Sequence, residues 1–249
     1  MSETITSENL QTILKFPFKD PNWKSKFTIG SLLYLIGFFI LPAFIVGGYA
    51  YEIMRRIIIE KNEPSMPEWD DYGEYLLNGV KLFGVGLIYG SPTLMLMLPF
   101  FLVVFSFPFV GMISEEYLNA FFVVLPLTIG MVFIASIIGF VFGMLGLAAK
   151  GHMVAKGEFA AAFRVREWWP IFRANLGGFF LAYLVLMALS YLLTFAVQIL
   201  MATLILCIIV PFLMVAVSFY LALVSNVLFA KAYADGVEKL AAQPKPDSI

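Results

Sequence analysis

Two long stretches of this chain carry almost no charge. The first runs from Leu82 to Ala149 and is ionised only at Glu115 and Glu116, and the second, Ala174 to Ala230, contains no ionisable acid or base of the Asp, Glu, Lys, Arg or His type. The 57 residues of the second stretch would form a helix of roughly 85 Å, whereas a bilayer has a hydrocarbon core of about 30 Å. The second stretch therefore has to cross a membrane at least twice, and neither stretch has the intramembrane charges that mark pumps and voltage sensors.

Composition supports a membrane protein and argues against nucleic acid as a partner. The sequence is 61% hydrophobic and 13% charged, whereas soluble domains are about a quarter charged. Its formal net charge is −1, and the basic residues are spread along the chain instead of forming the basic stripe that nucleic-acid binding requires. The single cysteine, Cys207, excludes an internal disulfide and is expected to be a small buried apolar residue.

The apolar segments predict an all-α fold, a polytopic transmembrane helical bundle with amphipathic interfacial elbow helices. A turn is expected between Val197 and Cys207, and kinks or short non-helical stretches are expected at the prolines inside the segments. The segments lie at about 28–51, 80–110, 119–149, 174–197 and 207–230.

The distribution of lysine and arginine predicts an orientation. These residues occur in the N-terminal strip and in the segments 55–81, 150–173 and 231–249, but none occurs in 111–118 or 198–207. The positive-inside rule therefore places the three basic segments and the C-terminus in the cytoplasm, and the loop with Glu115 and Glu116 outside.

The first apolar segment, 28–51, is compatible with two arrangements. A single kinked span would leave the basic strip before it outside, against the positive-inside rule. A re-entrant hairpin that turns near Pro42 would keep both basic flanks inside, because two half-helices of about 13 residues can enter the membrane and return.

The chain is expected to form a single transmembrane domain over 28–235, between an N-terminal interfacial strip and a flexible C-terminal tail. In the strip, 1–27, Ser7 is a candidate cap for a short helix with Leu10, Ile13 and Leu14 on one side, lying on the membrane. The tail is expected to comprise 236–249.

Two segments combine acidic and aromatic residues just before an apolar run and form a weak internal repeat. Each is predicted to form an amphipathic elbow at the cytoplasmic surface, one over 67–74 and the other over 157–170. In the first elbow the candidate interfacial motif consists of Trp69, Asp70, Asp71, Tyr72 and Gly73.

Small residues recur at helical spacing in the apolar segments. Such residues let helix backbones approach closely where lipid offers no hydrophobic drive for association. The candidate helix-packing residues are Gly86, Gly90, Ala135, Gly139 and Gly143, and the sequence leaves open whether they contact this chain or a second subunit.

No motif predicts catalysis, a metal or a cofactor. The acidic cluster between Glu60 and Glu74 has the residue type that hard cations bind, but it lacks a calcium-loop spacing and has basic neighbours to pair with. His152 has no second ligand at metal spacing and no nearby partner for acid–base chemistry, so we expect an interfacial polar residue. We therefore expect no enzyme, no catalytic residue, no metal and no cofactor.

One block of the sequence is similar to a known family. The sequence from Pro67 to Glu74 (PEWDDYGE), followed by GVK at 79–81, resembles the signature of the DUF4013 family of prokaryotic membrane proteins of unknown function. Further landmarks are PFKDPNW at 17–23, Leu41-Pro42 before Gly47-Gly48-Tyr49, and Gly157-Glu158-Phe159. The resemblance implies a helical bundle in the cytoplasmic membrane of a prokaryote and supplies no catalytic or binding residue.

Two functional hypotheses follow for this integral membrane protein. The first is a non-enzymatic scaffold or partner subunit, whose partners are the lipid bilayer and either a second membrane protein or further copies of itself. The alternative is a channel or permease for a small neutral or apolar solute, because prolines and a two-part repeat are typical of transporters.

Overall fold

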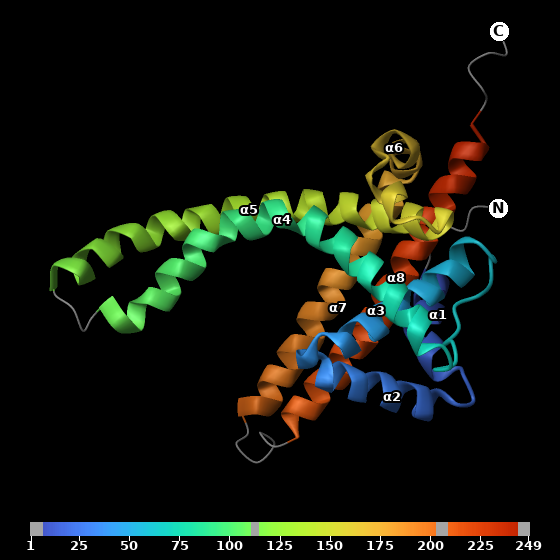
Figure 1. Ribbon diagram of the computed structural model, residues 1–249, viewed down its shortest axis with the longest axis horizontal. Helices are drawn as coiled ribbons and strands as arrows, with labels where there is room; N and C mark the ends of the chain where they lie inside the picture. The colour runs from blue at the N-terminus through green and yellow to red at the C-terminus, as the bar shows by residue number, and fades with distance from the viewer. Residues whose placement is uncertain (1–6, 111–114, 203–208, 244–249) are drawn as a thin grey trace, which may run out of the picture. The chain divides into compact units, whose positions relative to one another are not determined.

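The computed structural model describes residues 7–110, 115–202 and 209–243, and its regular secondary structure within these ranges is helical (Figure 1). Four of the helices are long and apolar enough to cross a membrane. The predicted all-α transmembrane fold is therefore confirmed, and the helices extend beyond the predicted apolar segments. They are α4 (Tyr72–Val110), α5 (Glu115–Lys156), α7 (Leu176–Ala202) and α8 (Val210–Ala241).

Shorter helices precede and connect the long ones. They are α1 (Ser7–Lys15), η1 (Phe16–Phe18), α2 (Trp23–Leu35), η2 (Ile36–Phe39), α3 (Leu41–Ile58), η3 (Phe159–Phe163) and α6 (Val165–Ala174). The break between η2 and α3 lies at Ile40, whose φ is 66°, two residues before Pro42. The break supports the predicted role of this proline, and the choice between a re-entrant and a spanning segment stays a prediction.

The chain divides into two compact units, where the sequence predicted a single domain over 28–235. The first unit comprises Met1–Val85 and Leu147–Ile249, and the second comprises Gly86–Gly146. Helices α4 and α5 each contribute to both units, because the unit boundaries fall within them.

Helix α8 is the centre of the first unit. It contacts α1, α2, α3, α6 and α7, and Figure 1 shows α7 beside it. The predicted interfacial strip forms the helix α1, but Ile13 and Phe16 are buried against the protein. The apolar side of the strip therefore packs on its own chain and does not face lipid there. The α8 side chains that are almost completely buried include Phe219, Leu223, Val224, Val227 and Leu228.

Glycines allow α3 and α4 to pack at backbone contact. A Cβ at Gly48 would lie 1.8 Å from the Tyr75 carbonyl oxygen, and a Cβ at Gly79 would lie 1.7 Å from the Phe44 carbonyl oxygen. Neither position has room for a side chain. These glycines are landmarks of the family resemblance, whereas the search for small residues in the apolar segments missed them as packing positions.

In the second unit, some of the predicted helix-packing residues lie in a contact and others do not. Ala135 is fully buried, and a Cβ at Gly139 would lie 3.0 Å from the Thr93 side chain. A Cβ at Gly90, by contrast, would have no neighbour within 4 Å. Gly86 and Gly143 are half-buried. The structure thus gives Ala135 and Gly139 an internal partner and leaves open space at Gly90.

Helix α4 continues through prolines that were expected to interrupt it. Pro92 lacks the N–H that would bond the Ile88 carbonyl, and the Ser91 hydroxyl donates to that carbonyl at 2.8 Å instead. The freed acceptor is therefore satisfied inside the helix, and the expected non-helical stretch does not occur in its described residues.

Two boundary predictions differ from the structure. The segment 67–71 is not helical, so the first predicted elbow helix is absent. The second predicted elbow forms η3 and α6. The two segments of the predicted internal repeat therefore differ in structure. Helix α8 continues to Ala241, so the tail predicted from 236 begins as helix. Helix α7 continues to Ala202, and the rest of the interval between Val197 and Cys207, where a turn was predicted, lies outside the described residues.

The glycine contact between α3 and α4 predicts an asymmetric response to alanine. Gly48→Ala should destabilise the protein by about 1–3 kcal/mol, because its methyl group would overlap a backbone carbonyl. Gly90→Ala should leave stability unchanged or slightly raised, because open space surrounds that position. Thermal unfolding of the two variants in the same detergent, followed by gel filtration, measures the difference. Equal midpoints would contradict the packing described here.

Candidate functional site

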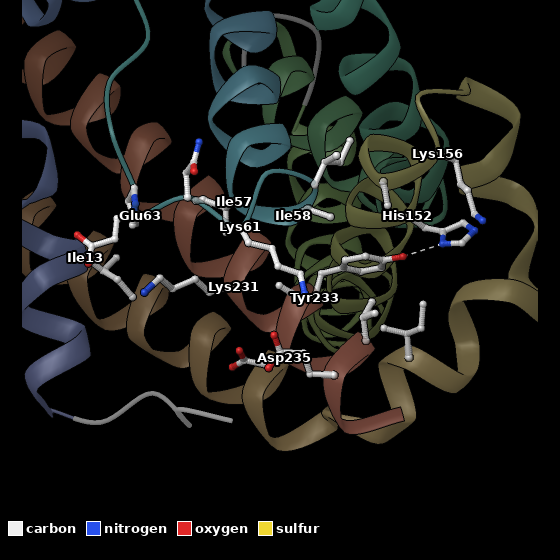
Figure 2. Close-up of a pocket in the computed structure, with 18 of the residues that line it drawn as sticks. Ile13, Ile57, Ile58, Lys61, Glu63, His152, Lys156, Lys231, Tyr233 and Asp235 are labelled. Atoms are coloured by element: carbon white, nitrogen blue, oxygen red, sulfur yellow. Dashed lines mark hydrogen bonds between the residues drawn. The ribbon is translucent and has the colours of Figure 1, made fainter. Parts of the chain in front are cut away.

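A cleft of about 940 Å³ lies in the first unit, where α3 and α5 end beside α6 and α8 (Figure 2). We call it the charged cleft. Its wall is partly apolar, with isoleucines from α1, α3 and α6, and partly ionic, with groups of both signs. The ionic and polar side chains that line it include Lys61, Glu63, His152, Lys156, Glu167, Lys231, Tyr233, Asp235 and Glu238.

His152 connects three helices at one end of the charged cleft. Its Nδ1 lies 2.8 Å from the Tyr233 hydroxyl of α8, and its Nε2 lies 3.0 Å from Glu167 Oε2 of α6. The histidine is only 3% exposed, so it is buried among protein groups, and its predicted place at the membrane interface stays a prediction. Sequence spacing could not find this arrangement, because its partners are 15 and 81 positions away.

Glu167 lies between two basic partners. The hydrogen bond from His152 lowers the pKa of the Glu167 carboxyl, and Arg164, whose Nη1 lies 3.3 Å from Glu167 Oε1, lowers it further. Glu167 is therefore ionised at neutral pH and orients the imidazole. This arrangement joins α5 to the elbow helix α6 and fixes the wall of the cleft.

Two lysines project into the charged cleft without partners. Among the described residues, Lys61 and Lys231 make no ion pair or hydrogen bond. Figure 2 shows both side chains lying between Ile13 at one side of the cleft and His152 at the other. Lys61 has a φ of 56°, a left-handed conformation that is usual for glycine after a helix and uncommon for other residues.

A buried lysine holds the segment between α3 and α4. Lys26 is 5% exposed, and its Nζ lies 2.7 Å from Asp20 Oδ2 and 2.6 Å from Glu68 Oε1. We call these three residues the Lys26 cluster. The same ammonium donates to the Met66 carbonyl at 3.0 Å. Lys26 is therefore not a free cationic flank of the first apolar segment, which weakens the charge argument for its orientation.

The aromatic motif is part of the same arrangement. Trp69 stacks on Tyr49 with ring centroids 3.9 Å apart, and its indole N–H donates to the Lys26 carbonyl at 2.9 Å. The Tyr49 hydroxyl donates to the Pro67 carbonyl and the Tyr75 hydroxyl to the Glu68 carbonyl. Side chains thus satisfy the carbonyls of a segment that has no regular backbone hydrogen bonds.

The remaining motif residues lie at the surface around the start of α4. Asp71 accepts a hydrogen bond from the Glu74 backbone N–H at 2.9 Å, so it caps α4 itself and not an elbow helix. Asp70, Tyr72 and Gly73 are exposed. The acidic cluster is dispersed among partners, since Glu68 pairs with Lys26 and Glu60 pairs with Arg55. No group of three metal-binding side chains is found among the described residues.

Comparison with known proteins identifies a family. A family model described as a protein of unknown function (DUF4013) matches residues 31–202. No curated protein matches the chain, and no solved structure matches it.

The Lys26 cluster predicts a pH-dependent contribution to stability. Burial alone would raise the pKa of the Asp20 carboxyl, but hydrogen bonds from Lys26 and the Asn22 backbone outweigh it and lower the pKa. A lowered carboxyl pKa stabilises the folded state above the ordinary value of 3.8, and this stabilisation is lost as the pH falls through the lowered value. Thermal unfolding should therefore show a larger acid-induced loss in the wild type than in Lys26→Met between pH 6 and about pH 2.5. An equal loss in both proteins would refute the pairing.

The hydrogen bond between His152 and Tyr233 predicts a cost for removing one hydroxyl. Tyr233→Phe leaves a buried imidazole nitrogen unsatisfied, so it should lower stability by about 1–3 kcal/mol. Tyr34→Phe is the matched control, because Tyr34 is 40% exposed. Thermal unfolding in detergent should show a lower midpoint for Tyr233→Phe only.

Proposed function

Since the chain belongs to the DUF4013 family, whose function is unknown, we propose from its own residues that it is a non-enzymatic scaffold or partner subunit. The membrane would be the cytoplasmic membrane of a prokaryote, with the C-terminus in the cytoplasm. The partner would be a second membrane protein or another copy of this chain, bound through the second unit.

The exposure of the second unit supports this proposal. In the most apolar window of α4 none of the residues is buried within the structure, and in that of α5 11% are buried. Where such a surface consists of large apolar side chains, contact with lipid is sufficient to cover it. The surface also contains two glycines, Gly90 and Gly130, at which an added Cβ would meet nothing within 4 Å.

Unfilled glycine positions favour a protein partner over lipid. Glycine in a helix interior costs about 0.5–1 kcal/mol relative to alanine, and lipid chains gain nothing specific from it. Interfaces between membrane helices are enriched in small residues because their backbones approach closely. Ala135 and Gly139 already serve the contact within this unit, so Gly90 and Gly130 remain available for a second protein.

The geometry at His152 supports a role without catalysis. Both ring nitrogens face protein partners, the Tyr233 hydroxyl and the Glu167 carboxylate, so the imidazole acts as a structural connector. The Lys26 cluster and Trp69 are likewise fully engaged in holding one segment of the chain.

A second cavity supports the alternative of a permease for a small apolar solute. It has a volume of about 360 Å³ and lies among Tyr34, Gly47, Ala50, Leu82 and Asn226. Its wall is largely apolar, and the Asn226 amide donates to the Ala222 carbonyl of its own helix. Transport would require this cavity to open alternately to both sides.

Leucine substitutions distinguish the proposed interface from other surfaces. Gly90→Leu and Gly130→Leu should keep the fold, because each position is open, and should prevent close approach of a partner helix. Gly177→Leu is the control, since Gly177 is equally open and lies on α7 outside the second unit. Each protein is tagged at the C-terminus, extracted gently from its native membrane, and examined by mass spectrometry and by its mass in detergent.

The wild type and Gly177→Leu should retain a stoichiometric partner or a defined oligomer, and at least one of the other two variants should lose it. Recovery of a folded wild-type monomer with lipid alone would overturn the proposal. Flux of an apolar solute into liposomes containing that monomer would then establish the permease alternative.

A further inference from the structure

The charged cleft lies at the depth of lipid head groups. On α8 the uncharged run from Val210 to Ala230 would measure about 31 Å, which matches a hydrocarbon core of about 30 Å. The next residue is Lys231, which lines the cleft. On α5, Lys150 likewise ends an uncharged run, two positions before His152. The cleft therefore begins where the hydrocarbon core ends.

Charges of both signs nearly balance in the charged cleft. Three lysines face four carboxylates, one of which, Glu167, is held by His152 and Arg164. Lys61 and Lys231 have no partner among the described residues, and the same holds for the Glu63 carboxylate. A ligand with several negative charges would be repelled by the carboxylates, whereas a zwitterion has a partner for each of its charges.

The apolar wall favours an amphiphile over a water-soluble zwitterion. Ile57, Ile58 and Ile59 at the end of α3 and Ile13 of α1 line the charged cleft beside the ionic groups. Figure 2 shows Ile57 and Ile58 above the lysines and Ile13 at one side of the cleft. Ile13 and Ile57 are already buried by the protein, whereas Ile58 is half-buried and Ile59 is 49% exposed. An ion alone would gain nothing from these two exposed isoleucines, but the glycerol and upper acyl carbons of a lipid would bury apolar area against them.

We propose that the charged cleft binds the head group of an aminophospholipid, with its phosphate on Lys61 and Lys231 and its primary ammonium on carboxylates that include Glu63. Phosphoethanolamine fits better than phosphocholine. A primary ammonium donates hydrogen bonds to carboxylates, whereas a quaternary ammonium is typically held by a cage of aromatic rings. Among the described residues, the aromatic side chains that line the cleft are Tyr233 and the His152 imidazole.

Native mass spectrometry of the full-length protein tests the proposal. The delipidated protein is mixed with equimolar phosphatidylethanolamine, phosphatidylcholine and phosphatidylglycerol, and the retained lipid is counted. Phosphatidylethanolamine should be retained preferentially. Lys61→Gln combined with Lys231→Gln should weaken its retention by about tenfold, because a charge-assisted hydrogen bond is worth about 1.5–3 kcal/mol.

Two further variants separate the head-group contacts from general charge effects. Lys19→Gln removes an exposed lysine outside the charged cleft and should leave retention unchanged. Glu63→Gln should reduce the preference for phosphatidylethanolamine over phosphatidylcholine, because it removes an acceptor for the primary ammonium. Both residues are exposed, so folding of these variants should not be affected.

Competition with water-soluble phosphoethanolamine tests whether the ligand is a lipid or a soluble compound with the same head group. In the presence of a large excess of this compound, lipid retention should persist, because the isoleucine wall contributes to binding. Complete displacement would overturn the proposal in favour of a soluble zwitterion. Equal retention of the three lipids, or unchanged retention in the double lysine variant, would also overturn it.

Discussion

The first unit depends on the packing of α1, α2, α3, α6, α7 and the end of α5 around α8. Its buried positions occupy much of the length of the helix, from Phe219 at the level of α2 to Gly236, where an added Cβ would lie 2.8 Å from the Ile171 carbonyl oxygen of α6. A hydrocarbon environment provides no hydrophobic drive between helices, so these contacts rely on close packing and on small residues. This dependence explains why glycines occur where α8 meets α2, α5 and α6, at Gly30, Gly151 and Gly236.

Ionic groups follow a different rule in this protein. They are absent from the long apolar runs and concentrate at the ends of those runs. There they form two kinds of site, one structural and one open to a ligand. The Lys26 cluster is closed, because each of its charges has a partner and the ammonium is buried. The charged cleft is open, because Lys61 and Lys231 remain without partners among the described residues. The paired charges of the Lys26 cluster therefore indicate a structural role, whereas the unpaired lysines of the charged cleft indicate a candidate binding site.

Sequence patterns predicted the features that depend on local composition and missed those that depend on long-range contacts. The four long helices follow from apolar runs, and the second elbow follows from its amphipathic pattern. The extended segment before α4 was predicted as a helix, because nothing local indicates that Tyr49, Tyr75 and Lys26 would satisfy its carbonyls. The hydrogen bonds of His152 were not predicted for the same reason, since its partners come from α6 and α8.

Helix α8 is long and apolar enough to cross a membrane, and we expect it to cross the hydrocarbon core and reach the head groups at Lys231. Spin labels at Met214 and Val237, in a background with Cys207→Ser, test it directly, because these positions are 44% and 42% exposed. Collision with oxygen should dominate at Met214, and collision with a water-soluble nickel chelate should dominate at Val237, in liposomes containing the protein. Equal accessibility of the two labels to the chelate would contradict the placement of α8 in the membrane.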